Sequence, residues 1–338
     1  MSQSPHYYIT KKALAKQFAI RRKANPVYLK ACAFFEATLI DRTSTLDAGL
    51  DFSIIDRIPI GTTELNFEEI CHQRATEITT STTGKIVLLW SGGIDSTLAL
   101  ISLIKTFRAH DELDRLTLLL SEESIAEYPS FYEDEIRHKL SHQIIEGTIY
   151  DHITPEDILV TGEHGDQLFG SDKLKIPILR GDAYIPYEEI LDFIISRKFG
   201  TEKYTQRIID FLHPLIAQSP VKIHTLYDYM WWLNFSAKWQ SVSLRLIYGL
   251  ERQHTALGKT VFHFYRSDDF QKWSLANHHL KIRKNWNSYK YIAKEIIYQY
   301  HKDEDYLINK EKEPSLKEVI VRKNEKTGFF STMFSSSQ

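Results

Sequence analysis

The stretch that decides the fold reads Lys85-Ile-Val-Leu-Leu-Trp-Ser-Gly-Gly-Ile-Asp-Ser-Thr97. A short apolar run, typical of a buried strand, ends at two glycines, and apolar residues with helical spacing follow from Ser96. Glycines let backbone N–H groups approach an anion closely, and the N-terminus of a helix adds aligned donors and partial positive charge. The sequence therefore predicts a strand, a tight turn and a helix that together bind phosphate.

The candidate nucleotide-binding residues of this turn are Ser91, Gly92, Gly93, Asp95, Ser96 and Thr97. The hydroxyl groups can donate hydrogen bonds to phosphate oxygens. The carboxylate of Asp95 repels phosphate unless a divalent cation lies between them, which makes Asp95 a candidate Mg²⁺ ligand. No Gly-Lys-Ser/Thr follows the glycines, so the turn is not the common P-loop.

A second apolar strand, Asp157-Ile-Leu-Val-Thr161, also ends in glycines and acids, Gly162-Glu-His-Gly-Asp-Gln-Leu-Phe-Gly170. In a parallel sheet the binding residues gather where strands end and loops begin. We therefore expect this loop to face the turn that begins at Ser91.

The turn resembles the pyrophosphate-binding loop of the ATP pyrophosphatases, which cleave ATP between its α- and β-phosphates. The second segment is similar to the Gly-Glu-Gly-Ser-Asp-Glu-Leu-Phe-Gly-Gly signature of the asparagine synthetases and the related β-lactam synthetases. Three residues depart from that signature: His164 replaces Gly, Gly165 replaces Ser, and Gln167 replaces Glu.

Site roles follow from this resemblance. It implies that Gly162 lies at the ATP, that Asp166 is a second Mg²⁺ ligand beside Asp95, and that Glu163 lies at an acyl-adenylate. A cation held between two carboxylates can offset the charge of departing pyrophosphate. Glu163, close to a reacting amine, could accept its proton.

Residues 318–329, Glu-Val-Ile-Val-Arg-Lys-Asn-Glu-Lys-Thr-Gly-Phe, resemble the family's Arg-x-Lys-x-Gly-Phe loop. The resemblance implies a catalytic lysine that neutralises the α-phosphate and stabilises the tetrahedral intermediate. Lys326 fits this role by its spacing to Gly328, and Lys323 fits almost as well by its spacing to Arg322.

A weaker similarity lies upstream. The segment Ser288-Tyr-Lys-Tyr-Ile-Ala-Lys-Glu295 is similar to the family's Lys-x-x-Leu-Arg-Glu helix, with Lys294 in place of Arg. An ordinary amphipathic helix accounts for the same pattern.

Composition and charge argue against a membrane protein, a secreted protein and a strongly basic nucleic-acid-binding protein. Hydrophobic residues are 43% and charged residues 25% of the 338, as in globular domains. The net charge of −2 and the pI of about 6.7 give no bulk field toward nucleic acid or membrane. No apolar run reaches transmembrane length and no signal-peptide pattern is found, so we expect a cytoplasmic protein. Cys32 and Cys71 have no metal-binding spacing and are expected to be buried thiols.

The expected fold class is α/β, a doubly wound parallel sheet like that of the adenine nucleotide alpha hydrolases, with a largely helical C-terminal half. We expect an N-terminal helical extension over residues 1–80 and a synthetase domain over 81–338. The latter divides into a nucleotide core, 81–182, and a helical acceptor region, 183–338. The tryptophans Trp231, Trp232 and Trp239 are expected in its core.

The apolar pattern predicts individual elements as well. Helices are expected at 66–78, 96–107, 132–140, 187–198 and 202–218, with a longer helical region at 222–251, and strands at 85–90, 116–120, 144–149 and 158–161. The first 35 residues contain no acid but include Lys11, Lys12, Lys16, Arg21, Arg22, Lys23 and Lys30. A solvated helix face is the favoured interpretation, with a transit peptide or a dock for an acidic partner as the alternatives.

The function implied by the resemblance is an ATP- and Mg²⁺-dependent ligase that forms an amide from a small-molecule carboxylate and ammonia or an amine. Asparagine synthetases begin with a glutaminase domain, which we do not expect here, so nitrogen comes from free ammonia, a separate amidotransferase or carrier partner, or an amine substrate. Nucleic acid and membrane are not expected partners. Two alternatives remain: a nucleobase- or RNA-modifying ATP pyrophosphatase, and a non-catalytic nucleotide-binding regulatory subunit.

Overall fold

The structure, a computed structural model, describes residues 5–310. These residues form two compact units. Unit 1 comprises residues 5–59 and 170–245, and unit 2 comprises residues 60–169 and 246–310. The domain boundaries expected from the sequence, after residues 80 and 182, remain a prediction.

Unit 2 contains a single all-parallel sheet of five strands, so the α/β class is confirmed. Its strands are β1 (Ile86–Leu89), β2 (Leu116–Leu120), β3 (Ser141–Ile144), β4 (Ile158–Thr161) and β5 (Val261–His263), in the spatial order β3-β2-β1-β4-β5. From β1 the chain moves outward to β2 and β3, and then returns to the other side of β1 with β4. The direction of the strand order therefore reverses between β1 and β4.

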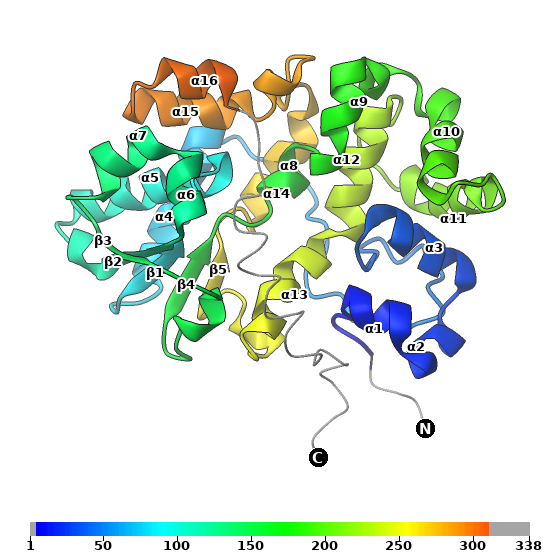
Figure 1. Cartoon of the computed structure of the whole chain (residues 1–338), viewed down its shortest axis with the longest axis horizontal. Helices are drawn as coiled ribbons and strands as arrows, with labels where there is room; N and C mark the ends of the chain where they lie inside the picture. The colour runs from blue at the N-terminus through cyan, green and yellow to red at the C-terminus, as the bar shows by residue number, and fades with distance from the viewer. Residues whose placement is uncertain (1–4, 311–338) are drawn as a thin grey trace. The chain divides into compact units, whose positions relative to one another are not determined.

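Helices and short turns cover this sheet. They are α4 (Phe67–Thr80), α5 (Ile94–Ala109), α6 (Glu122–Glu127), α7 (Pro129–Phe131), α8 (Gly165–Phe169), α14 (Asp268–Ala276), α15 (Tyr291–Tyr300) and α16 (Glu304–Asn309). Helix α5 packs against both α4 and α15 (Figure 1). Every residue of α5 from Ser96 to Ile104 is buried, because helices cover the face that a surface helix would expose to water.

Unit 1 is helical. Its helices are α1 (Lys11–Lys16), α2 (Phe18–Lys23), α3 (Pro26–Phe35), α9 (Lys175–Arg180), α10 (Tyr187–Phe199), α11 (Thr205–Ala217) and α12 (Leu226–Ala237), and the unit boundary falls within α13 (Trp239–Gly249). Trp231, Trp232 and Trp239 are fully buried, which confirms the expected core. The lysines of α1 and the basic residues of α2 are exposed, as expected for a solvated helix face.

Two predicted elements are wrong in their bounds. The helix expected at 132–140 is a single π-helical turn, Tyr132–Ile136. The strand expected at 144–149 lies earlier, at β3, where three of four side chains are exposed. An edge strand that faces water on both sides lacks the apolar alternation by which strands are located in a sequence.

Both cysteines are buried free thiols, as predicted. Burial raises the pKa of Cys32 to about 12, and burial also raises the pKa of Cys71. Thiolate is therefore scarce at neutral pH, and neither residue is suited to nucleophilic chemistry.

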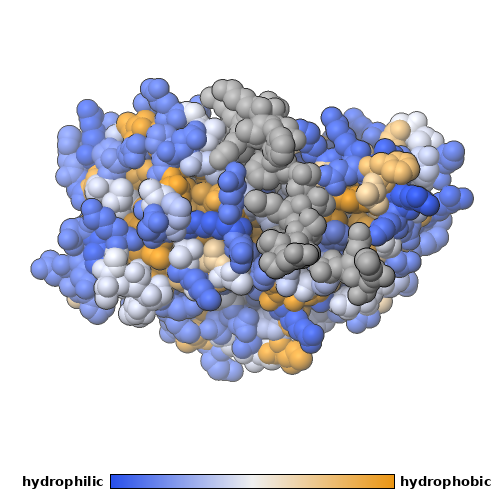
Figure 2. Space-filling view, turned by 90° about the horizontal axis from the view of Figure 1, so that it is seen from below, coloured by the Kyte–Doolittle hydropathy of each residue, from blue (hydrophilic) through white to orange (hydrophobic). Residues whose placement is uncertain are grey.

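The surface carries mixed polarity. One face shows mostly hydrophilic residues, with apolar residues in small groups between them (Figure 2). Within residues 5–310, no helix combines the length and the apolar character needed to cross a membrane.

Candidate functional site in unit 2

The turn after β1 depends on a glycine with a left-handed backbone. Gly92 has a φ of +70°, and a Cβ atom there would lie 2.3 Å from the carbonyl oxygen of Ser124. Both facts exclude an ordinary side chain. The turn leads into α5, whose N-cap is Gly93, and the backbone N–H of Gly93 donates to Oγ of Ser91 at 3.3 Å. Glycine has no side chain that could cap the first-turn N–H groups, and such a helix start suits an anion.

Hydroxyl groups hold the turn closed. The backbone N–H of Ser91 donates to Oγ of Ser96 at 3.0 Å, and the two side-chain oxygens are 2.8 Å apart. The indole N–H of Trp90 donates to Oγ1 of Thr97 at 3.1 Å. Ser91, Ser96 and Thr97 thus shape the turn in the structure, in addition to the phosphate contacts expected of them.

The two loops predicted to face each other do meet. Leu89 and Thr161, the last residues of β1 and β4, are register partners. A Cβ atom on Gly162 would lie 2.7 Å from the backbone nitrogen of Ser96, and one on Gly165 would lie 2.3 Å from the carboxylate of Asp95. The absence of side chains at these two glycines therefore lets the loop after β4 lie against the start of α5.

Asp95 and Asp166 share one cation, the ammonium group of Lys290. Nζ of Lys290 donates to Oδ2 of Asp95 at 2.5 Å and to Oδ1 of Asp166 at 2.8 Å. The Lys290 side chain is fully buried, whereas the carboxylates are 18% and 23% exposed. Such a buried ion pair stabilises only when every member keeps its partners. The structure therefore places both predicted metal ligands at one point of positive charge.

Two tyrosines surround this charge cluster. The hydroxyl of Tyr289 donates to Oδ1 of Asp166 at 3.4 Å, and that of Tyr265 donates to the backbone carbonyl of Asp95 at 3.1 Å. Burial, followed by the charge of Asp95, raises the pKa of Tyr265 well above its usual value. Tyr265 therefore remains a hydrogen-bond donor at all physiological pH values.

The two carboxylates of Asp95 and Asp166 are too few to hold a metal ion by themselves, but they suit Mg²⁺ bound together with substrate phosphates. Among residues 5–310 no group of three or more His, Cys, Asp or Glu side chains could hold a metal ion. Mg²⁺, however, is commonly bound by one or two carboxylates together with substrate phosphates and water. Asp95 and Asp166 would be those carboxylates, with the remaining ligands supplied by a bound triphosphate and water.

Glu163, the predicted proton acceptor, lies close to the loop that approaches Asp95. Glu163 directly follows Gly162 after β4, is partly buried, and its backbone N–H donates to Oγ1 of Thr161 at 3.2 Å. It therefore lies two residues before α8, the helix that carries Asp166. Lys326 and its alternative, Lys323, lie outside the described residues.

His164 occupies a position that favours glycine. Its φ is +78°, and its side chain is buried, with the ring centroid 5.3 Å from that of His263. The asparagine synthetase signature that this segment resembles has glycine at this position, and glycine adopts a left-handed backbone without strain. A non-glycine residue in this region stores strain, a feature that clusters at functional sites.

Sequence reasoning missed Lys290 as a member of the site. A signal was present, since Lys290 lies in the segment 288–295, which resembles the Lys-x-x-Leu-Arg-Glu helix of the asparagine synthetases. In the structure it precedes that helix, with a left-handed φ of 60° at the N-cap of α15. The helical pattern alone could not show that its side chain reaches residues 195 and 124 positions away.

The close approach at Gly165 gives a testable prediction. We expect Gly165→Ala to lower the free energy of unfolding by about 2 kcal/mol, because the new methyl group overpacks against the carboxylate of Asp95. Helix propensity acts in the opposite direction, since alanine favours a helix over glycine. Urea unfolding measures the net effect.

Gly84→Ala is the matched control for this substitution. A Cβ atom there would meet only Oγ1 of Thr82, at an ordinary 3.4 Å. We expect no loss of stability for this variant. Equal stabilities of the two variants would show that the loop after β4 does not lie against Asp95.

No protein-family model and no curated protein matches this chain.

Proposed function

We propose that this protein is an ATP-dependent ligase that adenylates a substrate carboxylate, releases pyrophosphate, and transfers the acyl group to ammonia or an amine. The observation that carries the proposal is the meeting of two loops at the carboxyl ends of β1 and β4, with Asp95 and Asp166 on one ammonium group. The order of the strands reverses between β1 and β4, and open parallel sheets bind ligands at such a reversal. A doubly wound fold of the asparagine synthetase type accords with this arrangement.

The chain's own groups suit the binding of a triphosphate. The uncapped start of α5 and the turn at Gly92 offer backbone N–H groups to the phosphates. Bound Mg²⁺ would supply positive charge that stabilises departing pyrophosphate. Lys290 holds Asp95 and Asp166 together, so that their positions are fixed before the substrate arrives.

The chemical step follows from the need for a leaving group. A carboxylate is a poor electrophile, so its oxygen first attacks the α-phosphorus of ATP, giving an acyl-adenylate and pyrophosphate. Ammonia or an amine then attacks the acyl carbon, AMP leaves, and Glu163 accepts a proton from the attacking nitrogen. Lys326 is the proposed counter-charge for the oxyanion of this second step.

ATP–pyrophosphate exchange tests the proposal, with a panel of amino acids and other small carboxylates supplied without any amine. We expect exchange that requires one class of carboxylate and Mg²⁺, and AMP formation once an amine is added. Conversion of ATP to ADP, or the absence of exchange with every acid, would contradict the ligase. Exchange that requires RNA would favour the RNA-modifying alternative. Stabilisation by ATP without exchange or AMP would favour the regulatory subunit.

A further inference from the structure

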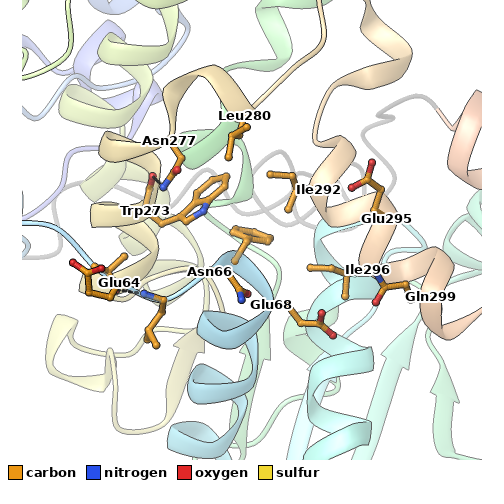
Figure 3. A pocket seen from close by; sticks show the side chains of 13 residues that line it. Glu64, Asn66, Glu68, Trp273, Asn277, Leu280, Ile292, Glu295, Ile296 and Gln299 are labelled. Carbon is orange, nitrogen blue, oxygen red and sulfur yellow. Dashed lines mark hydrogen bonds between the residues drawn. The ribbon is translucent and has the colours of Figure 1, made fainter.

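The charged residues of the chain are unevenly distributed. Unit 2 contains a cavity of about 420 Å³ between α4, α14 and α15, and the charged side chains that line it are Glu64, Glu68 and Glu295 (Figure 3). In contrast, the first 35 residues contain no acid and seven lysines and arginines. Because the whole chain has a net charge of −2, its remaining residues are net acidic. A local positive field therefore lies at the N-terminal helices of unit 1, although the net charge of the chain does not show it.

Six of these cations lie on α1 and α2, two helices that pack against each other (Figure 1). All six are exposed, whereas apolar side chains of both helices are buried against unit 1. The six, which we call the basic surface, are Lys11, Lys12, Lys16, Arg21, Arg22 and Lys23.

Most of the cations of the basic surface lack a counter-charge. Within residues 5–310, no carboxylate forms an ion pair with the two arginines or with the three lysines of α1. Lys12 and Lys16 are four positions apart on one helix, and like charges at this spacing destabilise a helix. A polyanion that neutralises the cations would relieve this repulsion.

An exposed phenylalanine accompanies the cations. Phe18, the first residue of α2, is 79% exposed, and among the described residues no other ring contacts it. Arg21 and Arg22 follow it at the i+3 and i+4 positions, which are its neighbours on a helix. Proteins bind single-stranded nucleic acid with this combination, because bases stack on aromatic rings while cations contact the phosphates.

Two other acidic partners fit the basic surface less well. Interfaces between proteins are depleted in lysine, whereas interfaces with nucleic acid are much more positively charged, and four of the six cations here are lysines. A helix that lies on an anionic membrane inserts a whole apolar face. The only large apolar side chain that α1 and α2 expose is that of Phe18.

We propose that the basic surface binds single-stranded nucleic acid, with a base stacked on Phe18 and the phosphates on the neighbouring cations. Phosphates and base faces are common to RNA and DNA, so both are used as probes. The proposal goes beyond the ligase function, because binding involves unit 1 and needs neither ATP nor turnover.

Fluorescence anisotropy of the full chain with labelled oligouridylate and oligothymidylate tests this surface, with an RNA duplex as a third probe. We expect both single strands to bind, and the tighter of the two identifies the preferred sugar. The affinity should fall with salt, with a slope of log K against log salt of about −4 if all six cations contact phosphates. Absence of binding at low salt, or tighter binding to polyglutamate or to phosphatidylserine vesicles, would overturn the proposal.

Variants then assign the contacts. Phe18→Leu keeps an apolar side chain without a ring, and should weaken single strands about tenfold while the duplex and the salt slope stay unchanged. Joint replacement of Arg21 and Arg22 by alanine should weaken single strands about twentyfold at 0.1 M salt and reduce the slope by about 1.4. The matched control replaces Arg137 and Lys139, two exposed cations of unit 2 that already pair with glutamates, and should change neither quantity. Equal effects of the two double variants would show that binding depends on net charge alone, and would refute the basic surface as the site.

Discussion

Replacing Asp95 with alanine is expected to lower the rate of ATP–pyrophosphate exchange by about a thousandfold, which corresponds to about 4 kcal/mol in the barrier. The reason is the developing charge on pyrophosphate. Asp95 lies in the first turn of α5, directly after the phosphate-binding turn, and its carboxylate is one of the two that share Lys290. Without it, one ligand for Mg²⁺ is lost at the point where negative charge increases.

Two further variants separate chemistry from folding. Asp114→Ala alters an exposed aspartate of the same unit and should exchange at the wild-type rate. Asp95→Asn preserves shape but not charge, and should therefore be as inactive as Asp95→Ala while retaining more stability. Equal pyrophosphate release by wild type and Asp95→Ala would remove the proposed mechanism.

Secondary structure could be predicted best where a few neighbouring residues determine it. The change from strand to helical spacing at Ser91–Ser96 lies within a few residues, and both elements form there. The strand at Ile158–Thr161 was likewise found from one buried apolar run. The edge strand β3 was misplaced because its side chains face water, so that no apolar pattern marks it.

The sequence allowed the two carboxylates of the site to be predicted, but not the lysine that joins them. Asp95 could be singled out because its carboxylate follows a glycine turn at the end of a buried strand, and Asp166 because its segment resembles the asparagine synthetase signature. Lys290 could not be assigned, because its role depends on a contact across 195 positions and on a left-handed backbone that no spacing rule encodes. Long-range charge pairing of this kind is decided by tertiary packing rather than by local preference.

At Gly165 the sequence differs from the signature that it resembles, and the structure shows a close contact there. Gly165 stands where the signature has Ser, and a Cβ atom there would lie 2.3 Å from the carboxylate of Asp95. In this chain the loop after β4 therefore approaches Asp95 more closely than a serine in the same backbone position would permit. Glycine at position 165 therefore permits the close contact at which Asp166 and Lys290 meet Asp95.

Replacing Lys290 with methionine is expected to lower the free energy of unfolding by about 3 kcal/mol, as when one partner of a buried ion pair is removed. Methionine preserves most of the side-chain volume and adopts the same backbone at no greater cost, so the loss of charge dominates. Asp95 and Asp166 would then face each other with only partial exposure to water. Urea unfolding measures the loss, and Lys259→Met, at an exposed site, is the control.

Magnesium distinguishes a metal-binding pair of carboxylates from a purely structural ion triad. In Lys290→Met, millimolar Mg²⁺ should restore part of the lost stability, because a ligand that binds only the folded state stabilises it. The substitution Asp95→Asn in the same background should also restore stability, by removing the repulsion, and should abolish the response to Mg²⁺. If Mg²⁺ stabilises Lys290→Met no more than it stabilises the double variant with Asp95→Asn, the two carboxylates do not form a metal site. The cluster would then be a structural ion pair that fixes α8 and α15 to the start of α5.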